Sequence, residues 1–144
     1  MTIKELEEEV IDEFLMFDDW MDKYDHIIEL GKTIPLIDEK YKTEAYLIKG
    51  CQSQAWLHAE LKDGKIYYSA DGDAIITKGI ISVLFRVLSG QDPKDVIESD
   101  LSFLDEIGLK DHLSPTRANG LLSTVKMMKF YAVALNAKLE KEGN

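Results

Sequence analysis

The chain has 144 residues, the size of one domain, and its 45% hydrophobic and 31% charged residues suit a domain with a buried core. Its formal net charge of −10 argues against a general basic field for nucleic acid or an anionic membrane. The single cysteine, Cys51, excludes an internal disulfide and a multi-cysteine zinc site. No apolar run approaches the ~20 residues of a membrane span, and no secretory signal is visible. We expect one domain over residues 1–144, in a reducing cytoplasm.

The acidity is concentrated at the N-terminus. Residues 1–25 hold ten acids against two lysines, a net charge of −8, while the rest of the chain sums to −2. A solvated helix face and a docking face for a basic partner both fit this pattern.

The first elements in chain order are two helices. Thr2 with Glu5 forms a capping-box pattern before apolar residues at helical spacing. A second helix is expected to begin at Asp18 or Asp19 and to be terminated by Gly31.

The middle of the chain changes to strand periodicity. Residues 54–62 alternate between small or apolar and larger side chains, Asp63-Gly64 predicts a tight turn, and residues 66–70 read as the returning strand. Residues 46–49 are a candidate third strand.

Helices fill the remainder. Asp73 is a candidate N-cap for an apolar, central helix that Gly90 closes. Two short helices follow, and Ser114-Pro115 opens the longest one, whose apolar stripe is Leu121, Leu122, Val125, Met128, Ala132, Leu135 and Leu139. We therefore predict an α+β fold: a small antiparallel sheet of about three strands with helices packed on one side.

Cys51 follows Gly50 and precedes a polar Gln-Ser-Gln run, which is typical of a loop that presents a thiol, although free cysteines are often buried. A thiol acts as a nucleophile in its thiolate form, and a nearby cation favours that form. Arg117 is the candidate cation, because it lies in the first turn of a helix, where the macrodipole disfavours positive charge. Pairing with Asp111 or simple solvation is the alternative for Arg117, and Lys49 is expected to be solvent-exposed.

The histidines define another possibility. A thiol hydrolase or acyl transferase needs a Cys–His pair, for which His58 and His112 are the candidates and His26 is the weaker one. No local spacing typical of metal ligands occurs, so the signal for a metal site of Cys51 with histidines is weak. No lysine lies in a recognisable setting for pyridoxal phosphate, and we expect neither a metal nor a cofactor.

Several segments match one family. Residues 50–56 resemble the G-C-Q-S-x-x-W signature of the SufE family of sulfur acceptors. Further agreement, in order and spacing, covers Trp20 and Tyr24 with residues 27–31, the segment around Asp71-Gly72-Asp73, and residues 113–121. The resemblance spans about residues 14–138. Ala55 and Gly72 are mild departures from it.

The resemblance implies that Cys51 accepts persulfide sulfur from a pyridoxal-phosphate-dependent, SufS-like cysteine desulfurase, stimulates that enzyme, and relays sulfur to a SufBCD-like iron–sulfur scaffold complex. It also implies an IscU-scaffold-like fold and a protein that acts with a desulfurase rather than one with independent turnover. Arg117 is the expected contact of the thiolate or partner. A homodimer is possible on the sequence. Two alternative functions also remain: a hydrolase that uses Cys51 with His58 or His112, and a non-enzymatic adaptor that acts through the acidic helices.

Overall fold

The structure is a computed structural model that describes residues 1–50 and 53–142. In these residues the chain forms six α-helices, three short 3-10 helices and a two-stranded antiparallel sheet. In chain order they are α1 (Ile3–Leu15), α2 (Trp20–Gly31), η1 (Glu39–Tyr41), η2 (Glu44–Tyr46), β1 (Ala55–Lys62), β2 (Lys65–Gly72), α3 (Ile75–Leu88), α4 (Pro93–Glu98), α5 (Phe103–Glu106), η3 (Lys110–His112) and α6 (Pro115–Glu142).

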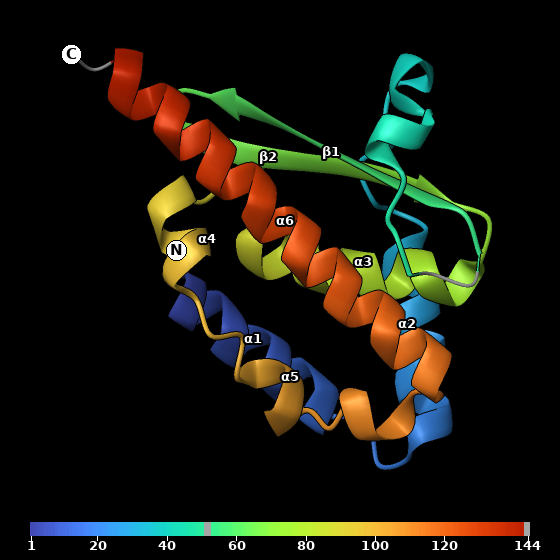
Figure 1. The fold of residues 1–144 in the computed structure, drawn as a ribbon. Coiled ribbons are helices and arrows are strands. Elements are labelled where there is room, and N and C mark those ends of the chain that lie inside the picture. Colours follow the sequence, from blue (N-terminus) through green and yellow to red (C-terminus); the bar gives the residue numbers. More distant parts are fainter. Residues whose placement is uncertain (51–52, 143–144) are drawn as a thin grey trace.

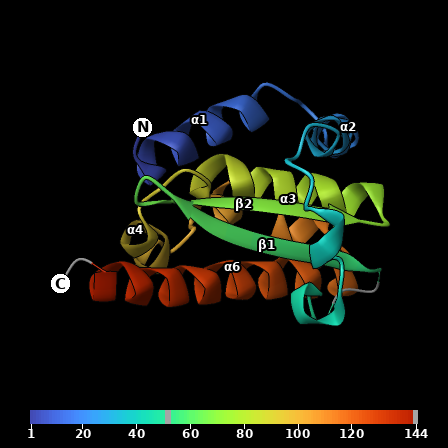
Figure 2. The same cartoon turned by 90° about the horizontal axis from the view of Figure 1, so that it is seen from above.

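The predicted α+β class is confirmed, and the α-helices lie on one side of the sheet (Figure 1). Helix α3 lies at the centre, in contact with α1, α2, α6 and β2, so both the sheet and the N-terminal helices pack on it. Seen from above, α1 and α2 lie along one side of the molecule and α6 along the other (Figure 2). Within residues 1–50 and 53–142, no helix has both the length and the apolar character that crossing a bilayer requires.

The predicted starts of the first two helices are confirmed. The Thr2 hydroxyl accepts a hydrogen bond from the backbone N–H of Glu5, whose side chain accepts one from the Thr2 N–H. Asp19 caps α2 by accepting from the backbone N–H of Asp22. Each cap satisfies donors that an uncapped helix leaves without partners.

Helix α2 ends at Gly31, as predicted, but Gly31 does not adopt the left-handed conformation of a typical glycine cap, and the C-cap residue Lys32 is also in a helical conformation. The missing side chain of Gly31 serves packing. A Cβ on Gly31 would lie 2.6 Å from the backbone nitrogen of Gly79, and one on Gly79 would lie 2.3 Å from the Ile27 carbonyl oxygen. The two glycines therefore let α2 and α3 touch backbone to backbone.

The predicted hairpin is confirmed, with continuous pairing from Ala55 opposite Gly72 to Lys62 opposite Lys65. Asp63 and Gly64 have φ values of 54° and 78°, as a two-residue turn between antiparallel strands requires. One face of the hairpin, which includes Leu57, is buried in the core.

The prediction of a third strand over residues 46–49 is wrong, because the described part of the sheet has only β1 and β2. Residues 44–46 form η2, after which Leu47 makes a single bridge to Trp56. The Tyr46 ring packs edge-on against Tyr41 and His58, above the outer face of the sheet, and a strand in the plane of the sheet does not bring it there.

Helix α3 is the buried central helix that its composition predicts, with nine buried residues. The cap predicted at Asp73 is wrong: Ala74 is the N-cap and makes no side-chain hydrogen bond, while the Asp73 N–H donates to the Gln54 carbonyl oxygen. Gly90, with φ of 83°, follows the end of α3 as expected.

Helix α6 begins as predicted, and Ser114 accepts from the backbone N–H of Arg117. Two tyrosine hydroxyls fasten this helix to the sheet: Tyr68 donates to the Met128 carbonyl oxygen, and Tyr131 donates to the Leu57 carbonyl oxygen. Burial raises the pKa of Tyr131 to about 12, so its hydroxyl stays protonated and can donate this hydrogen bond. Leu122, predicted to face the core, is instead 50% exposed.

We predict that Gly79→Ala destabilises the protein by about 2 to 3 kcal/mol, because the added methyl group overlaps the Ile27 backbone at the α2–α3 contact. Urea unfolding followed by circular dichroism measures the change. Glu8→Ala, on the exposed face of α1, is the control and should change the unfolding free energy by less than about 0.5 kcal/mol. Equal stability of wild type and Gly79→Ala contradicts this account of the helix contact.

Candidate functional site

The loop predicted to carry the thiol begins where Ile48 hydrogen-bonds to the start of β1. The Ile48 N–H donates to the Ala55 carbonyl oxygen at 2.8 Å, so the ends of segment 48–55 lie together. The predicted acceptor Cys51 lies outside the described residues, together with Gln52. The residues on either side of that pair, Gly50 and Ser53, are described, and they define the site.

Gly50 packs against α6 in a conformation that suits glycine. Its φ is +85°, and a Cβ there would lie 2.7 Å from the Ser123 hydroxyl oxygen. The left-handed backbone and the close approach both disfavour any larger residue. The chain therefore enters the G-C-Q-S segment directly from the surface of α6.

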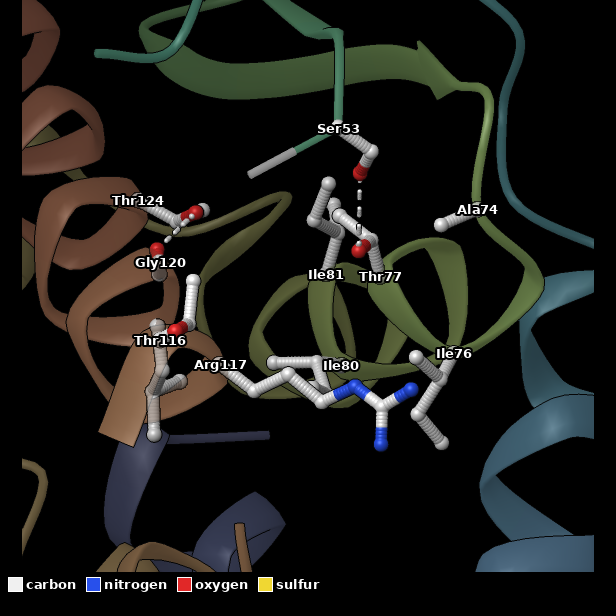
Figure 3. Close-up of a pocket in the computed structure, with 11 residues that line it drawn as sticks. Ser53, Ala74, Ile76, Thr77, Ile80, Ile81, Thr116, Arg117, Gly120 and Thr124 are labelled. Carbon is white, nitrogen blue, oxygen red and sulfur yellow. Dashed lines mark hydrogen bonds between the residues drawn. The ribbon is translucent and has the colours of Figure 1, made fainter. Parts of the chain in front are cut away.

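Ser53, on the other side, faces α3. Its hydroxyl oxygen lies 3.4 Å from that of Thr77, in the first turn of α3 (Figure 3). The segment that contains Cys51 is thus held at one end against α6 and at the other against α3.

A cavity of about 180 Å³ lies between these two helices. It is lined by Ser53, Ala74, Ile76, Thr77, Ile80, Ile81, Thr116, Arg117, Gly120, Leu121 and Thr124. Its walls are isoleucine and leucine side chains, and its hydroxyls come from Ser53, Thr124 and, at the beginnings of α3 and α6, Thr77 and Thr116 (Figure 3). The Thr124 hydroxyl is satisfied within α6, where it donates to the Gly120 carbonyl oxygen.

The cavity has a positive electrostatic bias. The first turns of α3 and α6 both line it, and the N-terminal end of a helix carries partial positive charge. Ala74 offers α3 no capping oxygen, so no side chain of the N-cap residue bonds to the first N–H groups of this helix. Such a setting favours an anion over a neutral group.

The candidate cation Arg117 lines the same cavity. Its side chain extends from the first turn of α6 along Ile80 toward Ile76 (Figure 3). Among the described residues Arg117 has no ion-pair partner, so the predicted alternative pairing with Asp111 is absent. Lys49 is exposed, as expected, and lies 3.7 Å from Glu44.

Asp71 fastens the neighbouring segment, a role that its sequence context did not indicate. Its carboxylate lies 2.7 Å from Lys42 and 3.8 Å from Lys78, and it accepts from the Gly72 N–H. Partial burial acts to raise the pKa of Asp71, but the hydrogen bonds from Lys42 and Gly72 outweigh it and hold this pKa below the usual value. The charged Asp71 ties residues 38–42, which cross the sheet, to the start of α3.

The hydroxyls of Ser53, Thr77 and Thr116 were not singled out by sequence reasoning. Ser53 and Thr116 lie within the G-C-Q-S and S-P-x-R segments, which was the available signal. The sequence contains no signal for Thr77, which lies in an apolar helix. Its position beside the site follows only from the packing of α3 near Ser53.

The histidines proposed as bases are engaged elsewhere. His58 stacks on Tyr41 with ring centroids 3.8 Å apart, on the outer face of the sheet. His112 stacks on Trp20 at 4.0 Å, and its Nδ1 lies 2.9 Å from the Gly108 carbonyl oxygen. His26 contacts Glu13 between α1 and α2. None of the three lines the cavity between α3 and α6.

In the described part of the chain, no group of three or more histidine, cysteine or acidic residues is arranged to hold a metal ion.

Comparison with known proteins places this α+β fold in a family. A sequence profile of the SufE family, described as an Fe-S metabolism associated domain, matches residues 8–132. An uncharacterized SufE-like protein of Rhizobium meliloti is 35% identical over 127 residues, covering 85% of this chain and 91% of its own length. A Synechocystis protein, also described as uncharacterized and SufE-like, is 34% identical, covering 87% of this chain and 79% of its own.

Two further similarities extend the comparison. An Arabidopsis thaliana protein named SufE-like protein 1, chloroplastic/mitochondrial, is 33% identical over 85% of this chain but only 33% of its own length. The solution structure of a hypothetical protein from Thermus thermophilus superposes with a TM-score of 0.75 over 90% of this chain and 94% of its own, at 19% identity, which supports the fold alone. The chain belongs to the SufE family, a family associated with iron–sulfur metabolism.

The pKa of His58 distinguishes a ring that only stacks on Tyr41 from one that acts as the base of a Cys–His pair. Burial lowers its pKa, an effect that Glu60 opposes and Lys40 reinforces. Pairing with a thiolate would instead raise it. We predict that the His58 ring titrates below about 6.5 in an NMR pH series of the folded protein. A midpoint clearly above that value contradicts this assignment and favours a Cys–His pair.

The same shift makes stability depend on pH. Because the pKa of His58 is lower in the folded state than in the unfolded chain, protonation of this ring favours the unfolded chain. The resulting loss of folding stability is absent above about pH 6.5 and grows as the pH falls through the folded-state pKa. His58→Phe keeps a ring against Tyr41 and has no titrating group. It should lose less stability than wild type between about pH 7.5 and about pH 5 in urea unfolding.

Proposed function

We propose that this protein is a sulfur acceptor and carrier, which takes persulfide sulfur from a cysteine desulfurase onto Cys51 for iron–sulfur cluster assembly. The Cys51 thiolate attacks the outer sulfur of the donor's cysteine persulfide, and a new sulfur–sulfur bond forms as the donor's bond breaks. Cys51 then carries the persulfide, and the donor cysteine leaves as a thiolate. The exchange is balanced and needs no metal, external oxidant or histidine base.

The observation that carries this proposal is the placement of Gly50 and Ser53. These two residues flank Cys51 and Gln52 in the sequence; Gly50 packs against α6, and Ser53 faces α3 beside a cavity biased toward anions. A thiolate and a persulfide are both anions with apolar sulfur atoms. An apolar cavity with hydroxyls and helix N-termini at its edge suits such a group and shields it from oxidants. Membership in the SufE family supports the same chemistry.

Arg117 acts on this group by charge. Its guanidinium has no ion-pair partner among the described residues and lines the cavity that adjoins Ser53. A cation there favours the thiolate of Cys51 before transfer and the persulfide anion after it. Its position also leaves it available to contact the docked donor.

The partners follow from the proposed exchange. The donor is a SufS-like desulfurase, which holds its own pyridoxal phosphate, and a SufBCD-like scaffold complex is the recipient. The free thiol requires a reducing location, for which we propose the cytoplasm. No contact in the described residues supports the alternative hypothesis of a thiol hydrolase with His58 or His112, because both rings stack elsewhere and neither lines the cavity.

We predict that Cys51 carries the transferred sulfur. After incubation with a cysteine desulfurase and cysteine, the wild-type protein should gain about 32 Da per sulfur atom, and a reductant should remove it. Cys51→Ser should gain nothing. Intact-protein mass spectrometry and peptide mapping test both points. Sulfur uptake by Cys51→Ser, or turnover of a thioester substrate by the protein alone, contradicts the proposal.

Arg117→Ala should slow sulfur transfer by about tenfold, because loss of the positive charge reduces the thiolate fraction. The pH dependence of Cys51 alkylation should move toward higher pH in parallel. Lys94→Ala, which removes an exposed cation from the distant α4, is the matched control. Unchanged transfer and alkylation in Arg117→Ala would reduce Arg117 to a residue that only lines the cavity.

A further inference from the structure

The outer face of α6 is unusually apolar for a solvent-exposed surface. Leu122, Phe130 and Val133 are 50%, 70% and 52% exposed. Together with the exposed Lys126 they follow the helical spacing i, i+4, i+8 and i+11, so they form one stripe. The core-facing residues Leu121, Met128 and Ala132 lie on the other side of α6. We call the set Leu122, Lys126, Phe130 and Val133 the α6 stripe.

The α6 stripe borders two adjoining surface hollows of about 530 and 620 Å³. Both are lined by Gly50, Ser123 and Lys126, and the first also by Lys49, Met127 and Phe130. Leu122 lines the second. The hollows thus run from the middle of α6 to Gly50, the residue directly before Cys51.

We propose that the α6 stripe and its hollows are the docking surface for the protein that delivers sulfur to Cys51, an inference that rests on the proposed function. The surface fits a partner with apolar side chains to fill the hollows and carboxylates opposite Lys49 and Lys126. Its continuity with Gly50 is the first argument, because sulfur exchange requires the donor to reach this part of the chain.

Charge is the second argument. Residues 115–142 carry five basic and two acidic side chains, whereas the whole chain has a net charge of −10. Lys126 has no ion-pair partner among the described residues, and the contact of Lys49 with Glu44 joins two groups that are 72% and 88% exposed, which makes it weak. Both lysines are therefore available to a partner's carboxylates, which would guide its approach.

A symmetric pair of copies fits this surface less well than a donor. Two α6 stripes packed about a twofold axis bring Lys126 near its own copy, and like charges at an interface oppose association. Such a pair would also cover Gly50 on both chains and so obstruct sulfur exchange. The acidic side of the molecule, formed by α1 and α2, lies away from α6 (Figure 2).

Leu122→Ser with Phe130→Ser tests the surface, because both side chains are exposed and their loss leaves the core intact. Binding is measured by calorimetry with the cysteine desulfurase of the same organism, in a Cys51→Ser background so that no sulfur is exchanged. We expect the dissociation constant to rise about tenfold or more, as for exposed aromatic and aliphatic anchors at an interface. Lys126→Glu should also weaken binding and reduce its dependence on salt.

The matched control is Met16→Ser with Met21→Ser, which removes two apolar residues of 79% and 76% exposure from the acidic side. It should bind the desulfurase as the parent does. With Cys51 restored, the stripe variant should need more protein for half-maximal sulfur transfer but reach the same rate at saturation. Circular dichroism verifies folding of each variant.

Three results would overturn the inference: unchanged affinity in the folded stripe variant, equal loss in the methionine control, or a wild-type dimer that dissociates when the stripe is changed. The last would assign the surface to a second copy. Failure of the proposed function gives a different pattern, in which the stripe variant loses binding but wild-type Cys51 acquires no sulfur from the bound desulfurase.

Discussion

The contact between the backbones of α2 and α3 at Gly31 and Gly79 is the constraint on which the rest of the structure depends. It brings α3 close enough to α2 that the apolar residues of α3 are enclosed, with the sheet and α6 covering its other sides. Dispersion and hydrophobic burial are strongest in such close packing. Since Thr77 is only two residues before Gly79, the same contact fixes the first turn of α3, and with it one wall of the cavity beside Ser53.

The opposite wall depends on how α6 is held. The hydroxyls of Tyr68 and Tyr131 bond to backbone carbonyls across the α6–sheet contact, and burial of both phenols favours their protonated, donating form. Helix α6 thereby keeps a fixed position relative to β1, the strand that follows the cysteine-bearing segment. Gly50 then lies against α6 and Ser53 against α3. The scaffold therefore fixes the residues on both sides of Cys51, on which the proposed sulfur exchange depends.

Local rules predicted those features that neighbouring residues decide. The capping box at Thr2, the turn at Asp63-Gly64 and the start of α6 after Ser114 each need only a few adjacent side chains, and all three are confirmed.

The errors arose where contacts with distant segments determine the local structure. Asp73 has the sequence context of a helix cap, but its N–H bonds to Gln54 and Ala74 is the N-cap. The packing role of Gly31 was missed, because it depends on Gly79 lying against it. Residues 46–49 look extended, but Tyr46 packs on Tyr41 and His58 instead. For the candidate site, sequence motifs named Arg117, and only the fold brings it to the cavity that Ser53 adjoins.

The distribution of charge gives the two sides of the molecule different physical characters. Acids crowd residues 1–25, whereas α6 carries an excess of basic side chains, and the two regions lie on opposite sides of the central helix (Figure 2). Under the proposed function, an anionic sulfur group beside α6 would lie on the basic side of the molecule, and nearby positive charge favours a thiolate. For the proposed sulfur donor, the same separation places a basic, apolar surface beside Gly50 and an acidic surface on α1 and α2. Charge complementarity with carboxylates on that donor would then favour the docking that we propose, with the donor against α6 and Gly50.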